Sequence, residues 1–209
     1  MKKISESTVR RLSLYLRFLQ EAADRGLDTI SSDELARRGG TTSAQVRKDL
    51  SFFGSFGKRG LGYSVPELVH RIRDILGLTH TWRVALVGAG KIGSALFSYR
   101  DFQRRGFHIR AVFDSDPLKV GTPWGDLLVR RDEEMDRALI EEEIDIVIVA
   151  VPAEAAQGVV DRVVKAGGRA ILNFAPTRLR VPDSIALRNV DMTVELEGLA
   201  YAISGERLR

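Results

Sequence analysis

A glycine-rich segment that begins at Gly88 carries the clearest chemical pattern in the sequence. Its spacing is Gly-x-Gly-x-x-Gly, and it comprises Gly88, Ala89, Gly90, Lys91, Ile92 and Gly93. The segment follows the apolar run 83–87 and opens a helical pattern at 94–97, which is the strand–loop–helix context of a dinucleotide-binding turn. In such a turn the glycines permit a tight bend, a close approach of pyrophosphate and close helix packing, and Lys91 is placed near the phosphates.

An acidic residue, Asp114, ends the next predicted strand, 109–113, and lies 24 residues after Gly90. In dinucleotide-binding sheets, a carboxylate near this position accepts the ribose 2′-hydroxyl and would repel a 2′-phosphate. The spacing therefore favours NAD(H) over NADP(H). The alternative is a related sheet that binds coenzyme A or no ligand.

Residues that would catalyse hydride transfer are not evident beside this site. Such enzymes usually place His, Lys, Tyr or a metal next to the substrate. His70 and His80 precede the predicted nucleotide domain, and His108 begins a strand at the end away from the expected ligand. No Tyr-x-x-x-Lys occurs, and no second domain is large enough for a substrate. The pattern favours a sensor without a catalytic residue, although Asp or Glu could serve in a dehydrogenase.

A second pattern, in residues 42–53, suits contact with DNA. Val46, Leu50 and Phe53 share one face of the predicted helix and can dock on a core. The candidate DNA-contacting residues of this segment are Ser43, Gln45, Arg47, Lys48 and Ser51. Because Arg can fork onto guanine while Ser and Lys reach base edges or phosphates, the helix suits a major groove.

The segment 54–63 has four glycines in ten positions between aromatic residues, which predicts a β-hairpin. Lys58 and Arg59 would lie at its tip, where a basic ribbon can enter a narrow minor groove. A solvent-exposed basic turn is the alternative.

The elements around this segment have the order of a winged helix-turn-helix. Apolar spacing from Val9 through Leu19 predicts a first helix that ends near Gly26. A short second helix should begin at Ser31 or Ser32 and end at Gly39-Gly40, and a fourth should run from Pro66 to Gly77.

From Trp82 onward, strands alternate with helices, which predicts a Rossmann-like, doubly wound parallel sheet. The predicted strands are 83–87, 109–113, 144–151, 170–173 and, as a last addition, 190–194, and the helices include 132–143, 153–166 and 196–203. We therefore expect a winged-helix domain in 1–80, a Rossmann NAD(H)-binding domain in 81–193 and a C-terminal helix in 194–209.

Charge is unevenly distributed along the 209 residues. Residues 1–81 carry 14 Lys/Arg against 9 Asp/Glu, whereas the remainder carries 18 against 19. A basic N-terminal part favours a polyanionic partner, and a solvated helical surface is the alternative. The absence of cysteine excludes disulfides and thiolate metal sites, so no metal is expected. No apolar run could span a bilayer and no signal peptide is visible, so we expect a cytoplasmic protein.

Several of these motifs occur together in one known family. They are Gln45-Val46-Arg47-Lys48-Asp49-Leu50-Ser51, Gly57-Lys58-Arg59-Gly60-Leu61-Gly62-Tyr63, the segment 88–93, Phe113-Asp114-Ser115-Asp116-Pro117, Val151-Pro152, Asn173-Phe174-Ala175-Pro176 and Asn189-Val190-Asp191. With these motifs in this order, the chain resembles the Rex family of bacterial redox-sensing repressors over essentially its whole length.

The resemblance implies a homodimer in which the C-terminal helix, about Val194–Ile203, crosses into the partner subunit. It implies that NADH and NAD⁺ compete for one site and that NADH releases a palindromic operator DNA. It further implies a switch in which Arg17, Tyr99 and Asp191 exchange partners. The nicotinamide would lie against an apolar surface formed by Val151, Pro152, Phe174 and Met192, which would disfavour the cationic ring of NAD⁺ by desolvation.

Two other functions fit the residues alone. One is an oxidoreductase or coenzyme A-binding enzyme with a basic helical appendage. The other is a DNA-binding protein whose Rossmann domain serves only for dimerisation.

Overall fold

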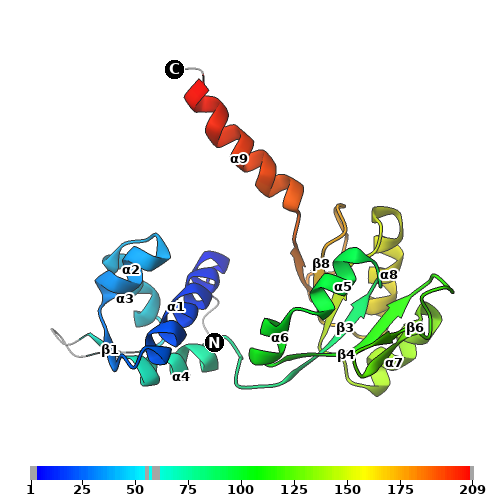
Figure 1. Cartoon of the computed structure of the whole chain (residues 1–209), viewed down its shortest axis with the longest axis horizontal. Helices are drawn as coiled ribbons and strands as arrows, with labels where there is room; N and C mark the ends of the chain where they lie inside the picture. The colour runs from blue at the N-terminus through cyan, green and yellow to red at the C-terminus, as the bar shows by residue number, and fades with distance from the viewer. Residues whose placement is uncertain (1–3, 55–56, 58–61, 208–209) are drawn as a thin grey trace. The chain divides into compact units, whose positions relative to one another are not determined.

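The computed structural model describes residues 4–54, 57 and 62–207, and the chain divides into two compact units, Met1–His80 and Thr81–Arg209 (Figure 1). The first unit is helical with one short antiparallel ribbon. Its elements are α1 (Glu6–Asp24), β1 (Thr29–Ile30), α2 (Ser32–Gly39), α3 (Ser43–Ser51), β2 (Tyr63–Ser64) and α4 (Val65–Ile75). This is the order of a winged helix-turn-helix, as the sequence predicts.

The turns of the first unit form where capping residues require them. The Ser31 and Thr42 side chains accept backbone N–H groups at the starts of α2 and α3, and Gly40, which follows α2 and caps it, has the left-handed conformation. Ile30 of β1 pairs with Tyr63 of β2 in a two-stranded antiparallel ribbon. The hairpin predicted within 54–63 lies largely outside the described residues, so it stays a prediction.

The first unit has its core between α1 and the helices packed on it. Leu12, Leu16 and Leu19 of α1 are buried, as are Val46 and Leu50 of α3. Two residues that were predicted to lie on buried apolar faces are not fully buried. Val9 is exposed, and Phe53 lies beyond the end of α3 and is only half-buried.

The second unit is a seven-stranded sheet in the order β5-β6-β4-β3-β7-β8-β9, in which only β5 is antiparallel to its neighbour. The strands are β3 (Trp82–Val87), β4 (Phe107–Asp114), β5 (Pro123–Trp124), β6 (Leu127–Arg131), β7 (Ile146–Val149), β8 (Ala170–Asn173) and β9 (Ala186–Asn189). The helical segments are α5 (Lys91–Phe97), α6 (Arg100–Arg104), the 3₁₀ turn Asp132–Glu134, α7 (Met135–Glu141), α8 (Ala153–Lys165) and α9 (Met192–Arg207).

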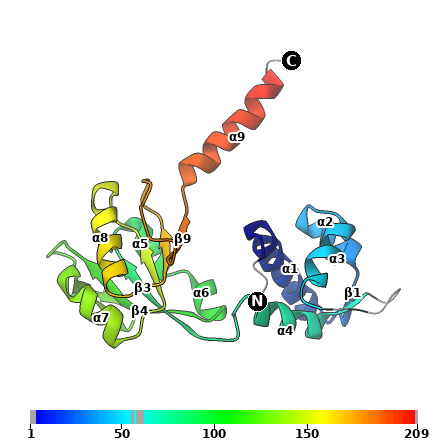
Figure 2. The ribbon, with the colours of Figure 1, turned by 180° about the vertical axis from the view of Figure 1, so that it is seen from behind.

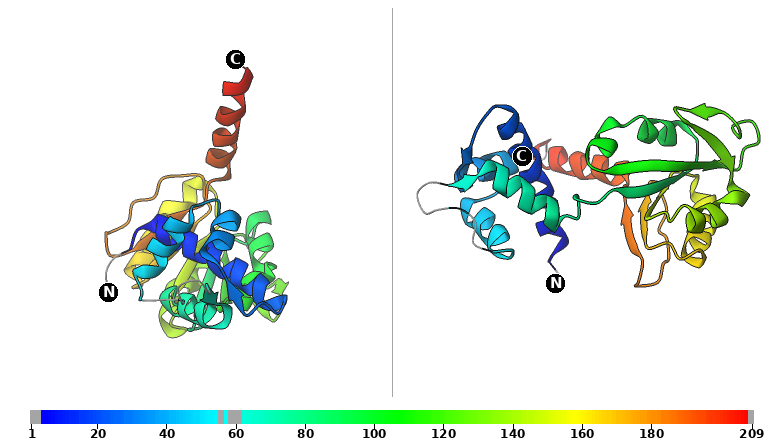
Figure 3. Two further views of the ribbon diagram at one scale, coloured as in Figure 1. Left: turned by 90° about the vertical axis from the view of Figure 1, so that its left-hand side faces the viewer. Right: turned by 90° about the horizontal axis from the view of Figure 1, so that it is seen from below.

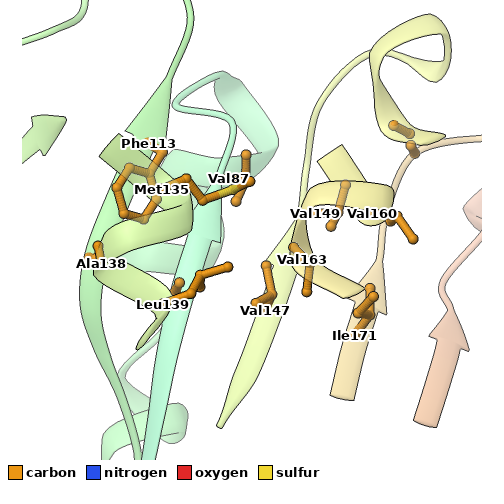
Figure 4. Close-up of a cluster of buried hydrophobic side chains, with 14 of the residues drawn as sticks. Val87, Phe113, Met135, Ala138, Leu139, Val147, Val149, Val160, Val163 and Ile171 are labelled. Atoms are coloured by element: carbon orange, nitrogen blue, oxygen red, sulfur yellow. The ribbon is translucent and has the colours of Figure 1, made fainter. Parts of the chain in front are cut away.

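Apolar side chains cover both faces of this sheet, and its central strands β3 and β7 are accordingly almost continuously hydrophobic. On one face, the strand residues Val87, Phe113 and Val149 pack with Leu139 of α7 and Val160 of α8 (Figure 4). On the other face, the cluster that contains Val84, Leu86 and Val112 is covered partly by α5 and α6 (Figure 3). The sheet is therefore doubly wound, and β3 lies at its centre between β4 and β7.

The predicted strand at 190–194 is wrong. The last strand is β9, which ends at Asn189, and α9 begins at Met192 (Figure 2). The reason is local: the Asp191 carboxylate accepts the backbone N–H of Thr193 at 2.9 Å, which favours the start of a helix over a continuing strand. The antiparallel pair β5–β6 was not predicted, because its strands are short and separated only by Gly125-Asp126.

Candidate dinucleotide site and DNA-contacting helix

The glycine-rich loop joins β3 to α5, and its three glycines have different surroundings. Gly88 has φ +106°, and a Cβ there would lie 2.4 Å from the Ala150 carbonyl oxygen. A Cβ on Gly93 would lie 2.0 Å from the Gly88 carbonyl oxygen, so the helix could not pack where it does. A Cβ on Gly90 would meet nothing within 4 Å. Gly88 and Gly93 are thus required by the protein's own packing, whereas Gly90 faces open space.

Asp114 ends β4 and ties this loop to the sheet. Its Oδ2 accepts the backbone N–H of Ala89 at 2.7 Å and the Lys119 ammonium at 3.1 Å, and its Oδ1 accepts the backbone N–H of Asp116 at 2.8 Å. Burial raises the pKa of Asp114, but the hydrogen bonds from Asp116, Lys119 and Ala89 outweigh burial and hold the pKa below its ordinary value. The group is therefore a carboxylate at neutral pH.

A cavity of about 720 Å³ opens beside the loop, at the edge where the carboxyl ends of β3, β4 and β7 meet. The volume is in the range of cavities that hold small molecules and cofactors, which is roughly 300–1,000 Å³. Its position is the crevice at the switch point of a doubly wound sheet, where such folds bind ligands. Most of the predicted cofactor-binding residues line it: Gly88, Gly90, Lys91, Ile92, Asp114, Val151, Pro152 and Phe174.

Three predicted cofactor-binding residues are not among the lining residues. Ala89 and Gly93 contribute to the loop itself, through the hydrogen bond to Asp114 and through close packing. Met192 begins α9, is 62% exposed as a residue, and lies outside the cavity lining.

Three charged residues that line the cavity were not predicted as part of the site. Asp116 and Lys119 both line it, and the Lys119 ammonium lies 3.8 Å from Asp116 and 3.1 Å from Asp114. Asp132 also lines it and accepts the Arg162 guanidinium at 3.2 Å. Asp116 and Lys119 follow Asp114 by two and five residues, and this short spacing was the signal that could have predicted them.

Helix α3 presents basic side chains on its solvent-facing side. Arg47, Lys48 and Ser51 are exposed, and the Arg47 guanidinium donates to the Ser32 hydroxyl at 2.9 Å. Ser43 is half-buried at the start of the helix. Lys58 and Arg59, the predicted hairpin tip, lie outside the described residues. The described part of this surface therefore combines two cations with hydroxyl groups, which is suited to a nucleic acid groove.

One buried carboxylate of α3 was not predicted from the sequence. Asp49 is fully buried and accepts the Arg11 guanidinium at 2.6 and 2.8 Å, the Tyr15 hydroxyl at 3.1 Å and the Gln45 amide at 2.8 Å. Burial raises its pKa, but the bonds from Arg11, Gln45 and Tyr15 outweigh burial and lower it. Gln45, predicted to contact DNA, is thus bonded within the unit.

The three predicted switch residues belong to different units, Arg17 to the first and Tyr99 and Asp191 to the second. Arg17 is exposed on α1 in the first unit. Tyr99 is 52% exposed and its ring lies edge-on to Phe102, 5.1 Å between centroids. Asp191 is half-buried and caps α9.

The described part of the chain shows neither a membrane-spanning helix nor a cluster of metal-ligating side chains. No helix in that part of the chain is long and apolar enough to cross a membrane. No group of three His, Asp or Glu side chains in that part is arranged to hold a metal ion.

Comparisons with known proteins extend this description. Residues 3–51 match the family model described as "Putative DNA-binding protein N-terminus", and residues 79–177 match the model described as "CoA binding domain". These matches and the solved structures below confirm the predicted fold: a DNA-binding unit followed by a Rossmann-like sheet.

Curated relatives match nearly the whole chain. The redox-sensing transcriptional repressor Rex of Carboxydothermus hydrogenoformans is 49% identical over 96% of this chain and 97% of its own. The Rex of Pelotomaculum thermopropionicum is 50% identical over 95% of this chain and 93% of its own.

Among solved structures, RSP in complex with beta-NAD⁺ and operator DNA is 38% identical, has a TM-score of 0.94, and matches 100% of this chain and 96% of its own. RSP in complex with beta-NADH is 36% identical, with a TM-score of 0.90, and matches 100% of this chain and 98% of its own. A third RSP structure, 36% identical with a TM-score of 0.90, is described as that of a Rex-family repressor. The chain belongs to the Rex family of redox-sensing transcriptional repressors.

Proposed function

We propose that this chain represses transcription by binding operator DNA through α3 and that NADH in the cavity beside the glycine-rich loop releases the DNA. The observation that carries the proposal is that one chain holds both parts: an open glycine-rich loop beside a cavity of about 720 Å³, and a capped helix with exposed Arg47 and Lys48. The relatives are named redox-sensing repressors, and RSP has structures with NAD⁺ plus operator DNA and with NADH.

The apolar wall of the cavity supports discrimination between the two redox forms. Val151, Pro152 and Phe174 follow the ends of β7 and β8 and line the cavity. The nicotinamide ring is neutral in NADH and positive in NAD⁺, and an apolar wall makes the positive ring costlier to desolvate. Each tenfold preference for NADH corresponds to about 1.4 kcal/mol.

The Asp114 carboxylate supports a preference for NADH over NADPH. A carboxylate oxygen can accept more than one hydrogen bond, and Oδ1 of Asp114 accepts only the N–H of Asp116 among the described contacts. We propose that it accepts the adenosine ribose hydroxyl. A 2′-phosphate there would face the negative charges of Asp114 and Asp116, which Lys119 only partly offsets.

On the DNA, we propose that α3 enters the major groove. Ser43, Arg47, Lys48 and Ser51 would contact bases or phosphates, and Gln45 would act through its bond to Asp49 as well as directly. Lys58 and Arg59 would contact the minor groove from the hairpin. A palindromic operator has two half-sites about one helical turn apart, so two copies of the chain are needed.

The exposed face of α9 supports assembly into a homodimer. Its described side chains, from Met192 to Ser204, are all exposed, and they include Leu196, Leu199 and Ile203. Exposed apolar residues at this density indicate a surface that another chain covers. The second unit offers an acceptor, an entirely apolar cavity on the sheet face whose lining includes Val84 and Leu172.

We therefore propose that residues 194–209 cross into the partner subunit. In the dimer, Arg17, Tyr99 and Asp191 would exchange partners between the NADH-bound and DNA-bound states. As a regulator of transcription, the protein would act in the cytoplasm.

The test is a mobility-shift titration of the full chain on a palindromic duplex selected by the protein from a randomised library. NADH should release the duplex at much lower concentration than NADPH, and coenzyme A should have no effect. Equal release by NADH and NADPH, or no release by either, would contradict the proposal. Release by coenzyme A alone would instead indicate that the cavity binds coenzyme A, the ligand of the family model that matches residues 79–177.

A further inference from the structure

The buried cluster around Asp49 joins two helices that are distant in sequence. Asp49 on α3 is 0% exposed, and Arg11 on α1 donates to it through both Nε and Nη2, at 2.6 and 2.8 Å. Tyr15, one turn further along α1, donates its hydroxyl at 3.1 Å, and Gln45 donates its amide from within α3. All four bonds converge on one carboxylate.

This arrangement restricts how α3 can lie on α1. A forked guanidinium–carboxylate contact depends on the direction of both groups as well as on their separation. Residues of a helix are spaced about 100° apart around its axis, so the direction of Asp49 determines the direction of its neighbours Arg47 and Lys48. Apolar contacts of Val46 and Leu50 would tolerate small slides and rotations that the fork does not.

We propose that Asp49 and Arg11 are positioning residues for operator recognition. Asp49 and Arg11 fix the rotation of α3 about its axis, so that Arg47 and Lys48 face the base edges of the operator. Asp49 and Arg11 do not contact the DNA themselves. This inference rests on the proposed DNA-binding function of α3 and goes beyond it, because it assigns sequence selectivity to a buried ion pair outside the contact surface.

Electrostatics makes the proposal testable, because charge and positioning predict opposite effects. Asp49→Asn removes a negative charge from a helix that faces a polyanion, which by itself strengthens binding to every duplex. Loss of the forked contact should instead weaken binding to the operator alone. A merely structural role would lower thermal stability without changing the ratio of operator to non-operator affinity in the folded protein.

The experiment compares the full-length wild type with Asp49→Asn at a temperature at which circular dichroism shows both to be folded. Dissociation constants are measured for the selected palindromic duplex and for a scrambled duplex of equal length at several salt concentrations. We expect operator affinity to fall about tenfold, or about 1.4 kcal/mol, with scrambled-duplex affinity unchanged or higher. An unchanged ratio of operator affinity to scrambled-duplex affinity would overturn the proposal, whether both affinities rise, fall or stay the same.

Two further variants complete the design. Asp33→Asn makes the same charge change at an exposed position of α2 and should not lower the preference for the operator. Arg11→Lys retains the positive charge but removes the fork, and should lower the preference. If Asp49→Asn does not fold, Arg11→Lys decides the question, and an unchanged preference then overturns the proposal.

The outcomes separate this inference from the proposed function. A wild-type chain without any preference for a selected duplex would contradict both. A wild-type preference that survives in Asp49→Asn and Arg11→Lys would contradict only the positioning role.

Discussion

The glycine-rich loop offers a sharp prediction, because Gly90 and Gly93 are three residues apart and differ completely in their surroundings. A Cβ on Gly93 would overlap the Gly88 carbonyl oxygen at 2.0 Å, so either the helix or the loop must move. A Cβ on Gly90 meets nothing within 4 Å, and its φ of −89° suits any residue. Gly93→Ala should therefore damage the fold, whereas Gly90→Ala should damage only ligand binding.

The magnitudes follow from these contacts. Overpacking of this kind costs about 1–3 kcal/mol, so Gly93→Ala should lower the melting temperature by roughly 3–10 °C for a unit of this size. Gly90→Ala fits the conformation already present and should leave the melting temperature unchanged or slightly higher, by up to about 1 kcal/mol of stability. If its methyl group displaces one hydrogen bond between the backbone and a ligand phosphate, NADH affinity should fall by about 1.5–3 kcal/mol, or roughly 10- to 150-fold.

The assays are thermal unfolding followed by circular dichroism, without ligand, and titration of NADH fluorescence with each variant. The two alanines serve as controls for one another, because each makes the same chemical change in the same loop. The reasoning would be refuted if Gly90→Ala melted as low as Gly93→Ala, or if it bound NADH as tightly as the wild type.

Three more predictions follow from the charged residues. Lys48→Ala should weaken DNA binding and lower by about one the slope of log affinity against log salt concentration. NADH affinity should stay the same, and a loss of NADH binding would contradict the division of functions between the two units. Asp114→Asn should narrow the preference for NADH over NADPH in fluorescence titrations, because it removes a charge that repels the 2′-phosphate, and an unchanged ratio would count against that role. The lowered pKa of Asp49 means that its carboxylate stabilises the fold above its unfolded pKa of about 3.9, and that this stabilisation is lost as pH falls through the folded pKa. The difference in melting temperature between wild type and Asp49→Asn should therefore shrink below about pH 4, and a constant difference down to pH 2 would contradict it.

The conformation of the glycine-rich loop was predictable because its pattern is local. The spacing of Gly88, Gly90 and Gly93 and the apolar strand before them lie within a dozen residues. The bond from Ala89 to Asp114 was not predictable in the same way. It depends on the parallel register that places Val87 beside Phe113, 26 residues away.

The Asp49 cluster shows why a helical face read from sequence is incomplete. Asp49 adjoins the apolar positions Val46 and Leu50, which was a signal that its carboxylate is buried, but its partner Arg11 is 38 residues earlier. The strand predicted at 190–194 failed for the opposite reason. β-Branched Val190 and Val194 favour a strand, yet the cap supplied by Asp191 starts a helix there.

The most direct test of the account is operator binding measured at a constant total concentration of nicotinamide dinucleotide while the ratio of NADH to NAD⁺ is varied. The account predicts a single transition from bound to released DNA as the ratio rises, displaced to higher ratios in Gly90→Ala. Binding that does not change with the ratio, or a transition that Gly90→Ala leaves in place, would contradict it.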